Sequence, residues 1–319
     1  KNSKIKIFNN FKKIKHILRK KVDYSMSSIV GLKGLEPTIE LIKCSKVIAI
    51  ANKESIICGW NIIENELKKN KTKFIPVDSE HFSIFKLIDN QSSQLIKKII
   101  ITASGGPFLK KKINNKIKIS DALNHPNWKM GKKITVDSST LMNKVFEVIE
   151  AQKIFNIKLN KIKILINPNS YIHAIIIFKN GTIKILAHEN KMEIPIFNSI
   201  FNDDKYFNYN TNNLNLAKIN SLNLSVPNHK KFKSLDLLKL IPQNDSLFET
   251  ILITVNDELV QMFLNKKIKY INILNFLLRI INFKKFKKYC NVKPNSIKQI
   301  LEVKELAKNC VIKYVKSKN

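Results

Sequence analysis

Short apolar runs rich in isoleucine and valine alternate with helical patterns through the first half of the sequence. The run KVIAI, residues 46–50, predicts a buried parallel strand, and SIICGWNIIENELKK, residues 55–69, predicts an amphipathic helix after it. KFIPV (73–77) and KKIIITA (97–103) predict two more strands. Because strands and helices take turns along the chain, the pattern predicts an α/β architecture.

The second half changes in character. KKITVDSS leads into a helix predicted at 140–155, and strands are predicted at 161–166 and across 172–188. In the latter stretch, Asn180-Gly181 predicts a tight hairpin turn in which both residues take a positive φ. The chain from about residue 202 is Asn-rich with weak periodicity, which predicts a linker, and beyond 230 it is mostly helical.

Composition limits the class of protein. A chain of 319 residues, 44% of them hydrophobic, is long enough for two or three domains with real cores. It has no stretch of about 18 uncharged apolar residues, so we expect no membrane-spanning helix. The basic N-terminal segment lacks the apolar core of a secretory signal, and the four scattered cysteines form no CxxC pair. Both features favour a reducing, cytoplasmic compartment.

The net charge of +33 raises the question of a nucleic-acid partner. The lysines are spread from end to end and mixed with asparagine and isoleucine, which indicates a bias of the whole chain and not a groove built for phosphates. We therefore expect no nucleic-acid partner, whereas an anionic small substrate would still be attracted.

The stretch VDSEH, residues 77–81, places Asp78 and Glu80 directly after a predicted strand. Ligands of α/β sheets bind at the carboxyl ends of strands, and Mg²⁺ and Mn²⁺ prefer carboxylate oxygens. Two ligands alone do not make a site. On these residues alone, a solvated turn with a helix cap is the simpler interpretation.

The helix predicted at 140–155 offers a third carboxylate. Its apolar residues share one face, while Asn143, Glu147 and Glu150 share the opposite face, with Lys144 to one side. That polar face is either solvated or turned into a cleft. In a cleft, Glu147 would complete a site of three carboxylates, and Asn143 and Lys144 would hold an anion.

Two loops carry further candidates. In TASGGPF, Ser104 and the following two glycines suit phosphate, because glycine lets backbone amides come close to a ligand. HPNWKMG, residues 125–131, is named the flap loop here. Its His125, Trp128 and Met130 suit a lid over a substrate, or else Trp128 and Met130 belong to the core.

The cluster IANKES ends the predicted strand at 46–50. Lys53 would be awkward at the end of a sheet unless it faces a ligand. The alternative is that Asn52 and Ser55 cap the next helix and Lys53 is solvated.

Together and in this order, the motifs resemble the 1-deoxy-D-xylulose 5-phosphate reductoisomerase family. The resemblance runs from about Val22 to the C-terminus and rests on IVGLKGLEPT, ANKES, PVDSEH, SGGPF, HPNWKMGKKITVDSSTLMNK, EVIEA and NPNSYIH. It implies an NADPH- and metal-dependent homodimer in the methylerythritol phosphate route to isoprenoids. The sugar phosphate would rearrange to an aldehyde that is reduced to 2-C-methyl-D-erythritol 4-phosphate.

The resemblance also implies a domain order. Residues 1–77 would be the remnant of a Rossmann-like NADPH-binding domain, and 78–201 an α+β catalytic domain with a sheet and a mobile flap. A linker at 202–229 and a C-terminal helical bundle at 230–319 would follow.

Roles carry over to matching residues. The Mn²⁺ or Mg²⁺ ligands would be Asp78, Glu80 and Glu147. Lys53 and Ser79 would hold the oxygenated end of the substrate. The phosphate pocket would consist of Ser104, His125, Ser138, Asn143 and Lys144. Trp128 and Met130 would lie on the flap, and the NADPH contacts would be Asn52, Glu54 and Gly131.

The sequence departs from the family in places. No turn like the family's GSTGSIG is present, so we expect an N-terminally incomplete piece of a normal enzyme, and weak NADPH binding if the chain is complete as it stands. NKVFE stands where the family usually has NKGLE, and Asn167 replaces a histidine, while Ser170 and His173 remain near the expected site. The competing hypotheses are a degenerate, non-catalytic chain and a basic nucleic-acid-binding protein.

Overall fold

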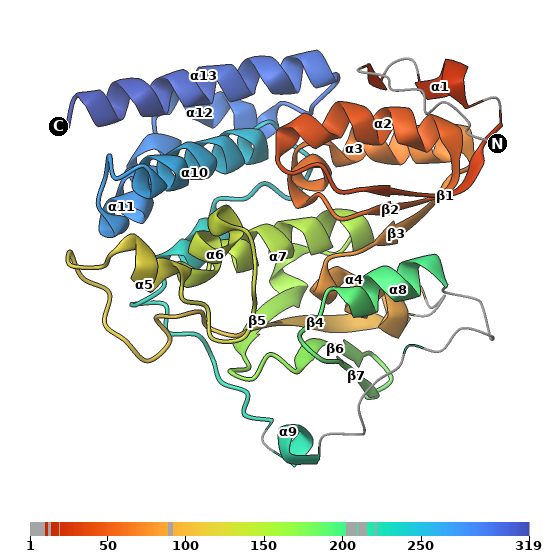
Figure 1. Ribbon diagram of the computed structural model, residues 1–319, viewed down its shortest axis with the longest axis horizontal. Coiled ribbons are helices and arrows are strands. Elements are labelled where there is room, and N and C mark those ends of the chain that lie inside the picture. The colour runs from red at the N-terminus through yellow and green to blue at the C-terminus, as the bar shows by residue number, and fades with distance from the viewer. Residues whose placement is uncertain are drawn as a thin grey trace, which may run out of the picture.

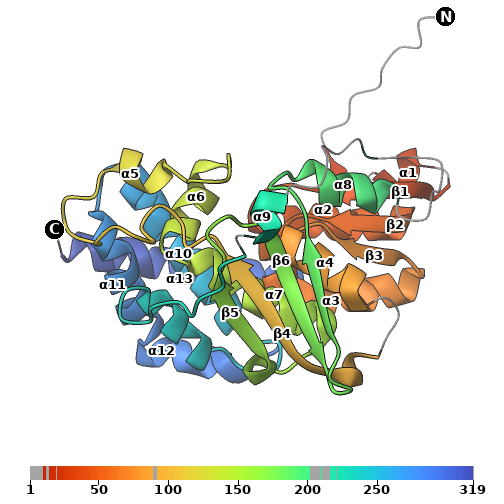
Figure 2. The ribbon, with the colours of Figure 1, turned by 90° about the horizontal axis from the view of Figure 1, so that it is seen from below.

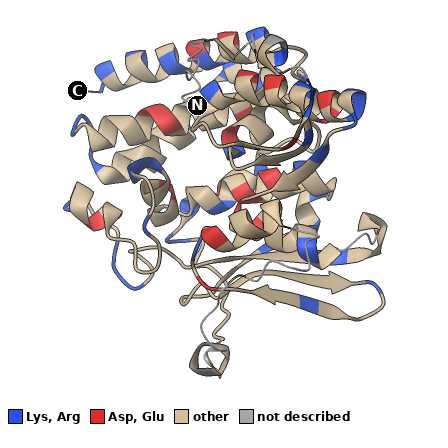
Figure 3. Cartoon of the chain, turned by 45° about the vertical axis from the view of Figure 1, so that its right-hand side comes forward, with Lys and Arg blue, Asp and Glu red and all other residues tan. Residues whose placement is uncertain are grey.

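The computed structural model of the protein describes residues 10–11, 14–18, 20–88, 92–201, 209, 216–220 and 222–318. It has a parallel sheet near the N-terminus, a mixed sheet and a layer of C-terminal helices, so the predicted α/β class is confirmed (Figure 1). Lys and Arg positions occur in every layer of the molecule, mixed with Asp and Glu (Figure 3). Among the described residues, no helix combines the length and apolarity needed to cross a membrane.

The first sheet is parallel, in the order β1 (Val22–Ser27), β2 (Ser45–Ile50), β3 (Lys73–Pro76). Its crossover helices α2 (Leu35–Cys44) and α3 (Lys53–Asn70) pack against each other. The core of β2 is fully buried, which confirms the parallel strand predicted at 46–50. Polar residues that follow β2 and β3 therefore gather at one edge of this sheet.

Helix α3 starts two residues before the predicted 55–69. The Asn52 side chain accepts a hydrogen bond from the backbone N–H of Ser55 at 2.6 Å, which satisfies one of the free donors of the first turn. The predicted cap by Asn52 is confirmed, whereas Ser55 contributes its backbone N–H and not its side chain. It puts Lys53 in the first helical turn, directly after the carboxyl end of β2.

The second sheet has the order β5 (Ile162–Ile166), β4 (Ile96–Ala103), β6 (Ile172–Phe178), β7 (Ile183–Ala187). β4 and β5 are parallel, and the other two pairs are antiparallel. Alternate residues of β4 and β6 pack with α4 (Ser79–Ile88) and α7 (Met142–Phe155) into one apolar core. Among the described residues, only the short helix α9 (Leu216–Asn220) stands on the side of the other face, near one end of the sheet (Figure 2).

The hairpin between β6 and β7 differs from the prediction. Phe178 N–H donates to the Thr182 carbonyl at 2.9 Å, and Gly181 N–H donates to the Phe178 carbonyl at 3.2 Å, so the loop has three residues and not two. In such a loop only the last residue is left-handed. Gly181 has a φ of 88°, and the positive φ predicted for Asn180 is wrong.

The stretch KKITVDSS does more than lead into a helix. It forms its own helix, α6 (Lys132–Ser139), and Leu141, with a φ of 59°, breaks the chain before α7 begins at Met142. The break turns the two helices relative to each other, and it sets the direction in which the first turn of α7 presents Asn143 and Lys144.

The remaining helices are α1 (Ile14–Ile17), α5 (Ile119–Leu123), α8 (Glu193–Ile200), α9 (Leu216–Asn220), α10 (Phe248–Leu264), α11 (Tyr270–Ile281), α12 (Lys284–Lys287) and α13 (Ile297–Lys316). Short 3₁₀ turns occur at Leu32–Gly34, Ser93–Leu95, Leu159–Lys161, Lys233–Lys239 and Lys288–Asn291. α10 packs on α11 and α13 and also reaches α3 and α6, so the predicted C-terminal helical region is confirmed. Most of the predicted linker lies outside the described residues, and the domain boundaries stay a prediction.

A buried ion-pair cluster joins α7 to α10. The Lys153 ammonium lies 2.6 Å from Asp245 Oδ1 and 2.9 Å from Glu249 Oε1, and the side chains of Lys153 and Glu249 are buried. We expect Lys153→Met to lower the free energy of unfolding by about 3 kcal/mol or more, because it leaves Glu249 buried without its counter-ion.

Urea denaturation measures this loss. Lys158→Met removes an exposed lysine that lies just beyond the C-terminal end of α7, and it should change the free energy of unfolding by less than about 0.5 kcal/mol. Equal effects of the two substitutions would contradict the buried pairing.

Candidate functional site

A cavity of about 220 Å³ lies where the chain leaves β2, β3 and β4 and where α7 begins. It collects most of the residues singled out from the sequence. Those that line it are Lys53, Asp78, Ser79, Glu80, Ser104, His125, Trp128, Met130, Ser138, Asn143, Lys144 and Glu147. Asn52, Glu54 and Gly131 do not line it.

The carboxylates at one end come from two elements. Asp78 and Glu80 stand at the junction of β3 and α4, and Glu147 stands in the second turn of α7. One oxygen from each of the three lies within 4.8 Å of the others. Their side chains are only 15%, 10% and 1% exposed, respectively. This burial rules out both the solvated turn and the solvated helix face.

Two lysines stand between these carboxylates. The Lys53 ammonium lies 2.9 Å from Asp78 Oδ2 and 3.7 Å from Glu147 Oε1, and it donates to Asn143 Oδ1 at 2.6 Å. The Lys144 ammonium pairs with Glu80 and Glu147. Lys53 is buried, so the alternative of a solvated lysine is wrong.

The electrostatics of this end are unbalanced. Burial, and next the Glu80 carboxylate, raise the pKa of Glu147 to about 8, although Lys144 and Lys53 oppose the shift. Against the effect of burial, Lys53 holds the pKa of Asp78 below its usual range, and Lys144 does the same for Glu80.

The donors fit a divalent cation. A hard ion such as Mg²⁺ or Mn²⁺ takes oxygen ligands, and its charge would stabilise the ionised form of Glu147 against the burial and the Glu80 repulsion that raise its pKa. Because the three carboxylates face the cavity, such an ion would keep coordination positions open toward a substrate.

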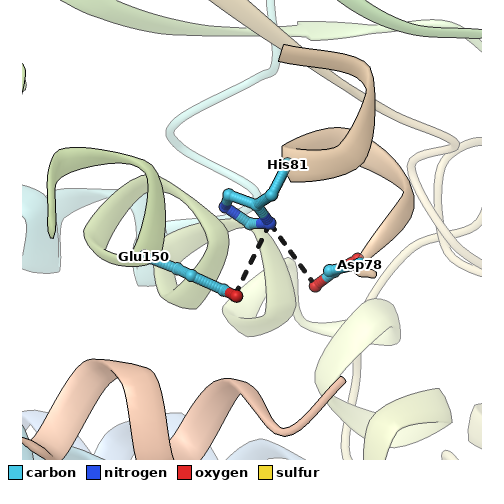
Figure 4. Close-up of side chains that lie close together, drawn as sticks. All are labelled: Asp78, His81 and Glu150. Atoms are coloured by element: carbon cyan, nitrogen blue, oxygen red, sulfur yellow. Dashed lines mark ion pairs between the residues drawn. The ribbon is translucent and has the colours of Figure 1, made fainter. Parts of the chain in front are cut away.

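A second cluster lies behind Asp78. The carboxylates of Asp78 and Glu150 both approach His81 Nδ1, at 3.7 and 3.6 Å (Figure 4). His81 Nε2–H donates to the backbone carbonyl of Glu147 at 2.9 Å, which ties α4 to α7 beside the carboxylates. His81 and Glu150 are buried and do not line the cavity, so this second group offers no open position to a substrate.

The sequence pattern assigns no role to either residue. Glu150 falls on the predicted polar face of its helix, and His81 is only the last residue of VDSEH. Their signal is a spacing of three residues, which puts Glu147 and Glu150 on one side of α7 and brings His81, in the first turn of α4, back toward Asp78 just before that helix.

The other end of the cavity is built around His125. Its Nε2 lies 3.1 Å from Ser104 Oγ and 3.1 Å from Ser138 Oγ, while its Nδ1 accepts from the backbone N–H groups of Asn127 and Trp128 at 3.1 and 3.0 Å. Since Nδ1 is an acceptor, the imidazole is neutral and carries its proton on Nε2. Burial, and next the Lys144 charge, lower the pKa of His125 to about 4.

The backbone at this end requires a glycine. Gly106 has a φ of 62°, and a Cβ there would lie 2.8 Å from the Ser138 carbonyl oxygen. The close approach keeps the SGG loop against α6 and brings Ser104 and Ser138 to the same imidazole. Both sequence-predicted serines of the phosphate pocket thus lie at one end of the cavity.

The flap loop covers one side of the cavity with Trp128 and Met130, both half-buried, so neither is a core residue. The Trp128 ring stands edge-on to His173 with centroids 6.1 Å apart, and His173 stacks on His188 at 3.7 Å. His173 and Ser170 line the cavity. Met192 also lines it, although the sequence predicts no role for this residue. The mobility of the loop stays a prediction.

The residues predicted to contact NADPH have internal partners. Asn52 Nδ2 donates to the carbonyls of Gly31, at 2.8 Å, and Ile29, and Glu54 accepts from Lys133 at 3.0 Å. Gly131 is exposed at the N-terminus of α6. Their contacts to the cofactor therefore stay predictions.

Comparison with known proteins adds a separate line of support. Three family models match the chain. The model described as 1-deoxy-D-xylulose 5-phosphate reductoisomerase matches residues 1–59, and the model of the C-terminal domain of that enzyme matches 74–155. A third, described as DXP reductoisomerase C-terminal domain, matches 189–310. The 1-deoxy-D-xylulose 5-phosphate reductoisomerase of Pelagibacter ubique is 53% identical over 306 residues, which are 94% of this chain and 78% of the relative. The chain belongs to the 1-deoxy-D-xylulose 5-phosphate reductoisomerase family. The enzyme of that name from Clostridium botulinum Eklund 17B is 38% identical over 91% of this chain and 75% of its own.

Solved structures of the family share the fold. The reductoisomerase of Zymomonas mobilis in complex with NADPH matches with a TM-score of 0.84 and 27% identity, over 96% of this chain and 79% of that one. A family structure with NADPH, fosmidomycin and magnesium matches with a TM-score of 0.85 and 28% identity, over 97% and 79%. The predicted membership of the reductoisomerase family is confirmed.

The tautomer of His125 has a consequence for pH. Folding lowers the pKa of His125 from about 6.5 to about 4. The neutral imidazole therefore contributes its full share to the stability of the folded state above a pH of about 6.5, and this share is lost as the pH falls toward 4. We expect the His125 ring proton resonance, assigned by its loss in His125→Asn, to titrate with a midpoint of about 4 in the folded protein and about 6.5 in urea. A midpoint near 6.5 in the folded protein would contradict the assigned hydrogen bonds.

Proposed function

We propose that this cavity is where the chain carries out the reaction of its family, the conversion of 1-deoxy-D-xylulose 5-phosphate to 2-C-methyl-D-erythritol 4-phosphate. The observation that carries the proposal is the pairing of two unlike ends in one cavity. Buried carboxylates gather at one end, and a neutral histidine with two serines forms the other.

The carboxylate end is the proposed site of the divalent ion, with Asp78, Glu80 and Glu147 as its ligands. When bound, the ion would polarise the oxygenated end of the substrate, and NADPH would supply the hydride for the reduction. Magnesium is present in some of the solved relatives, and Mn²⁺ is an equally suited hard cation for this set of oxygens.

Lys53 acts in this proposal as a fixed cation. Burial lowers its pKa, but the carboxylates of Asp78 and Glu147 outweigh burial and raise it above the usual range. Lys53 is therefore protonated at neutral pH and acts as a hydrogen-bond donor, not as a general base. Together with Ser79 it would orient the oxygenated end of the sugar.

The His125 end is the proposed phosphate pocket. The imidazole Nε2–H and the hydroxyls of Ser104 and Ser138 converge there as donors, and Lys144 adds positive charge between the two ends. Binding energy from the phosphate would position the reacting carbons at the metal end. The overall positive charge of the chain would speed the approach of the doubly charged phosphate.

The flap loop would close over the bound substrate, with Trp128 against His173. Closure would exclude water from the aldehyde and from the hydride transfer. Because the metal end and the phosphate end both keep their predicted groups, nothing in the cavity favours a degenerate chain. A cytoplasmic location stays a prediction from the sequence.

Glu147 gives the direct test. Glu147→Gln keeps the size of the side chain and removes the ligand charge, so we expect substrate-dependent NADPH oxidation with Mg²⁺ or Mn²⁺ to fall by about 100- to 1,000-fold. Glu302→Gln changes an exposed glutamate of α13 in the same way and should leave the rate unchanged. Unchanged turnover in Glu147→Gln would refute the metal assignment.

We also propose that two copies of the chain associate through the open face of the second sheet. Ile183 and Ile185 of the edge strand β7 are 59% and 51% exposed, and they point away from the face that α4 and α7 cover. An apolar sheet face of this kind is unusual on a monomer. A second copy, as the family resemblance implies, would cover it.

Light scattering after size-exclusion chromatography tests the assembly. We expect Ile185→Glu to shift a dimer to a monomer, because it places a charge on the apolar face that the second copy would cover. Leu306→Glu, on the exposed side of α13, should leave the dimer intact. A monomeric parent protein, or a dimer unaffected by Ile185→Glu, would contradict the proposal.

A further inference from the structure

One ammonium group outside the cavity connects several helices. Lys133 stands in the first turn of α6, three residues after Met130 of the flap loop. Its Nζ lies 3.0 Å from Glu54 Oε1, 3.1 Å from Asp137 Oδ2 and 2.9 Å from Asp257 Oδ1. These carboxylates belong to α3, α6 and α10, and the lysine side chain is 19% exposed.

The ring of Phe146 in α7 closes another side of the ammonium, with its centroid 5.2 Å from Nζ. Phe146 is fully buried and belongs to NKVFE, the stretch in which the sequence departs from the usual NKGLE. Asn256 in α10 donates to Asp137 Oδ1 at 2.8 Å and adds a second link between α6 and α10. A largely desolvated cation held by carboxylates and an aromatic face is a fixed point, since leaving it unpaired is costly.

Two of the carboxylate partners of this ammonium are adjacent in sequence to residues that line the cavity. Glu54 follows Lys53 at the metal end, and Asp137 precedes Ser138 at the phosphate end. Lys133 itself follows the flap loop, which carries Trp128. Lys133 does not line the cavity, so it touches neither substrate nor metal directly.

We propose that Lys133 is a positioning residue for the flap loop. Its ion pairs fix the C-terminal root of the loop against α3 and against α10 of the C-terminal helices, and so they set how readily the loop closes over the sugar phosphate. The inference rests on the proposed function, because it takes 1-deoxy-D-xylulose 5-phosphate as the ligand over which the loop closes.

The chain offers a direct optical readout. It has two tryptophans, and Trp60→Phe leaves Trp128 of the flap loop as the only one. In the Trp60→Phe variant of this chain with saturating Mg²⁺, 1-deoxy-D-xylulose 5-phosphate is titrated while Trp128 fluorescence is followed. The same proteins are titrated with Mg²⁺ alone by calorimetry.

Lys133→Met should raise the apparent Kd for the sugar phosphate about tenfold, because apparent affinity scales with the fraction of molecules competent to close. The Kd for Mg²⁺ should stay within about twofold, since the carboxylates of the metal end are untouched. Lys133→Arg keeps the charge and should restore most of the affinity. Lys132→Met removes the exposed neighbouring lysine and should behave like the parent.

Asp257→Asn is a second variant in case Lys133→Met does not fold. It leaves Lys133 paired with Glu54 and Asp137 and removes only the ion pair between Lys133 and α10. It should weaken sugar-phosphate binding in the same direction by a smaller factor. Parent-like affinity in both Lys133→Met and Asp257→Asn would overturn the inference and leave the proposed function standing. No fluorescence response in the Trp60→Phe parent would overturn both.

Discussion

Burial of opposite charges at one point governs the arrangement of this molecule. Asp78, Glu80 and Glu147 lie within reach of Lys53 and Lys144, and all five side chains are largely out of water. The desolvation of each ion costs several kcal/mol unless its partners are held in good geometry. The turns that follow β2 and β3 must therefore keep one fixed position and orientation relative to the first turns of α7.

Contacts around the cavity hold these turns and α7 in their relative positions. His81 ties α4 to the backbone of α7 through the Glu147 carbonyl, and Asn52 caps α3 so that Lys53 enters its first turn. On the far side, Lys133 joins α3 and α6 to α10. One apolar core runs without interruption from α2 through α7 to α13, so the C-terminal helices support the cavity although they contribute none of its lining residues.

Much of this was readable from the sequence, for physical reasons that can be named. The strands at 46–50 and 97–103 follow from apolar runs, and the opposed faces of the helix after Leu141 follow from its spacing. The order of the motifs then predicted which polar residues share a site. Those residues lie at the ends of strands and on one helix face, positions that local pattern determines.

What escaped prediction depends on distant contacts. KKITVDSS carries no clear helical period, and α6 forms because it packs on α7 and α10. The hairpin loop has three residues because the register of β6 and β7 places Phe178 opposite Thr182, which the Asn-Gly pair alone does not reveal. His81, Glu150 and Lys133 owe their roles to partners on other elements, and no local pattern identifies such partners.

The central claim is that Asp78, Glu80 and Glu147 hold the divalent ion. Anomalous diffraction from crystals grown with Mn²⁺ tests it most directly, because it locates the ion without reference to turnover. The account predicts one peak about 2.0–2.4 Å from an oxygen of each of the three carboxylates, on the cavity side. A peak between Asp78, His81 and Glu150, or none near Glu147, would contradict it.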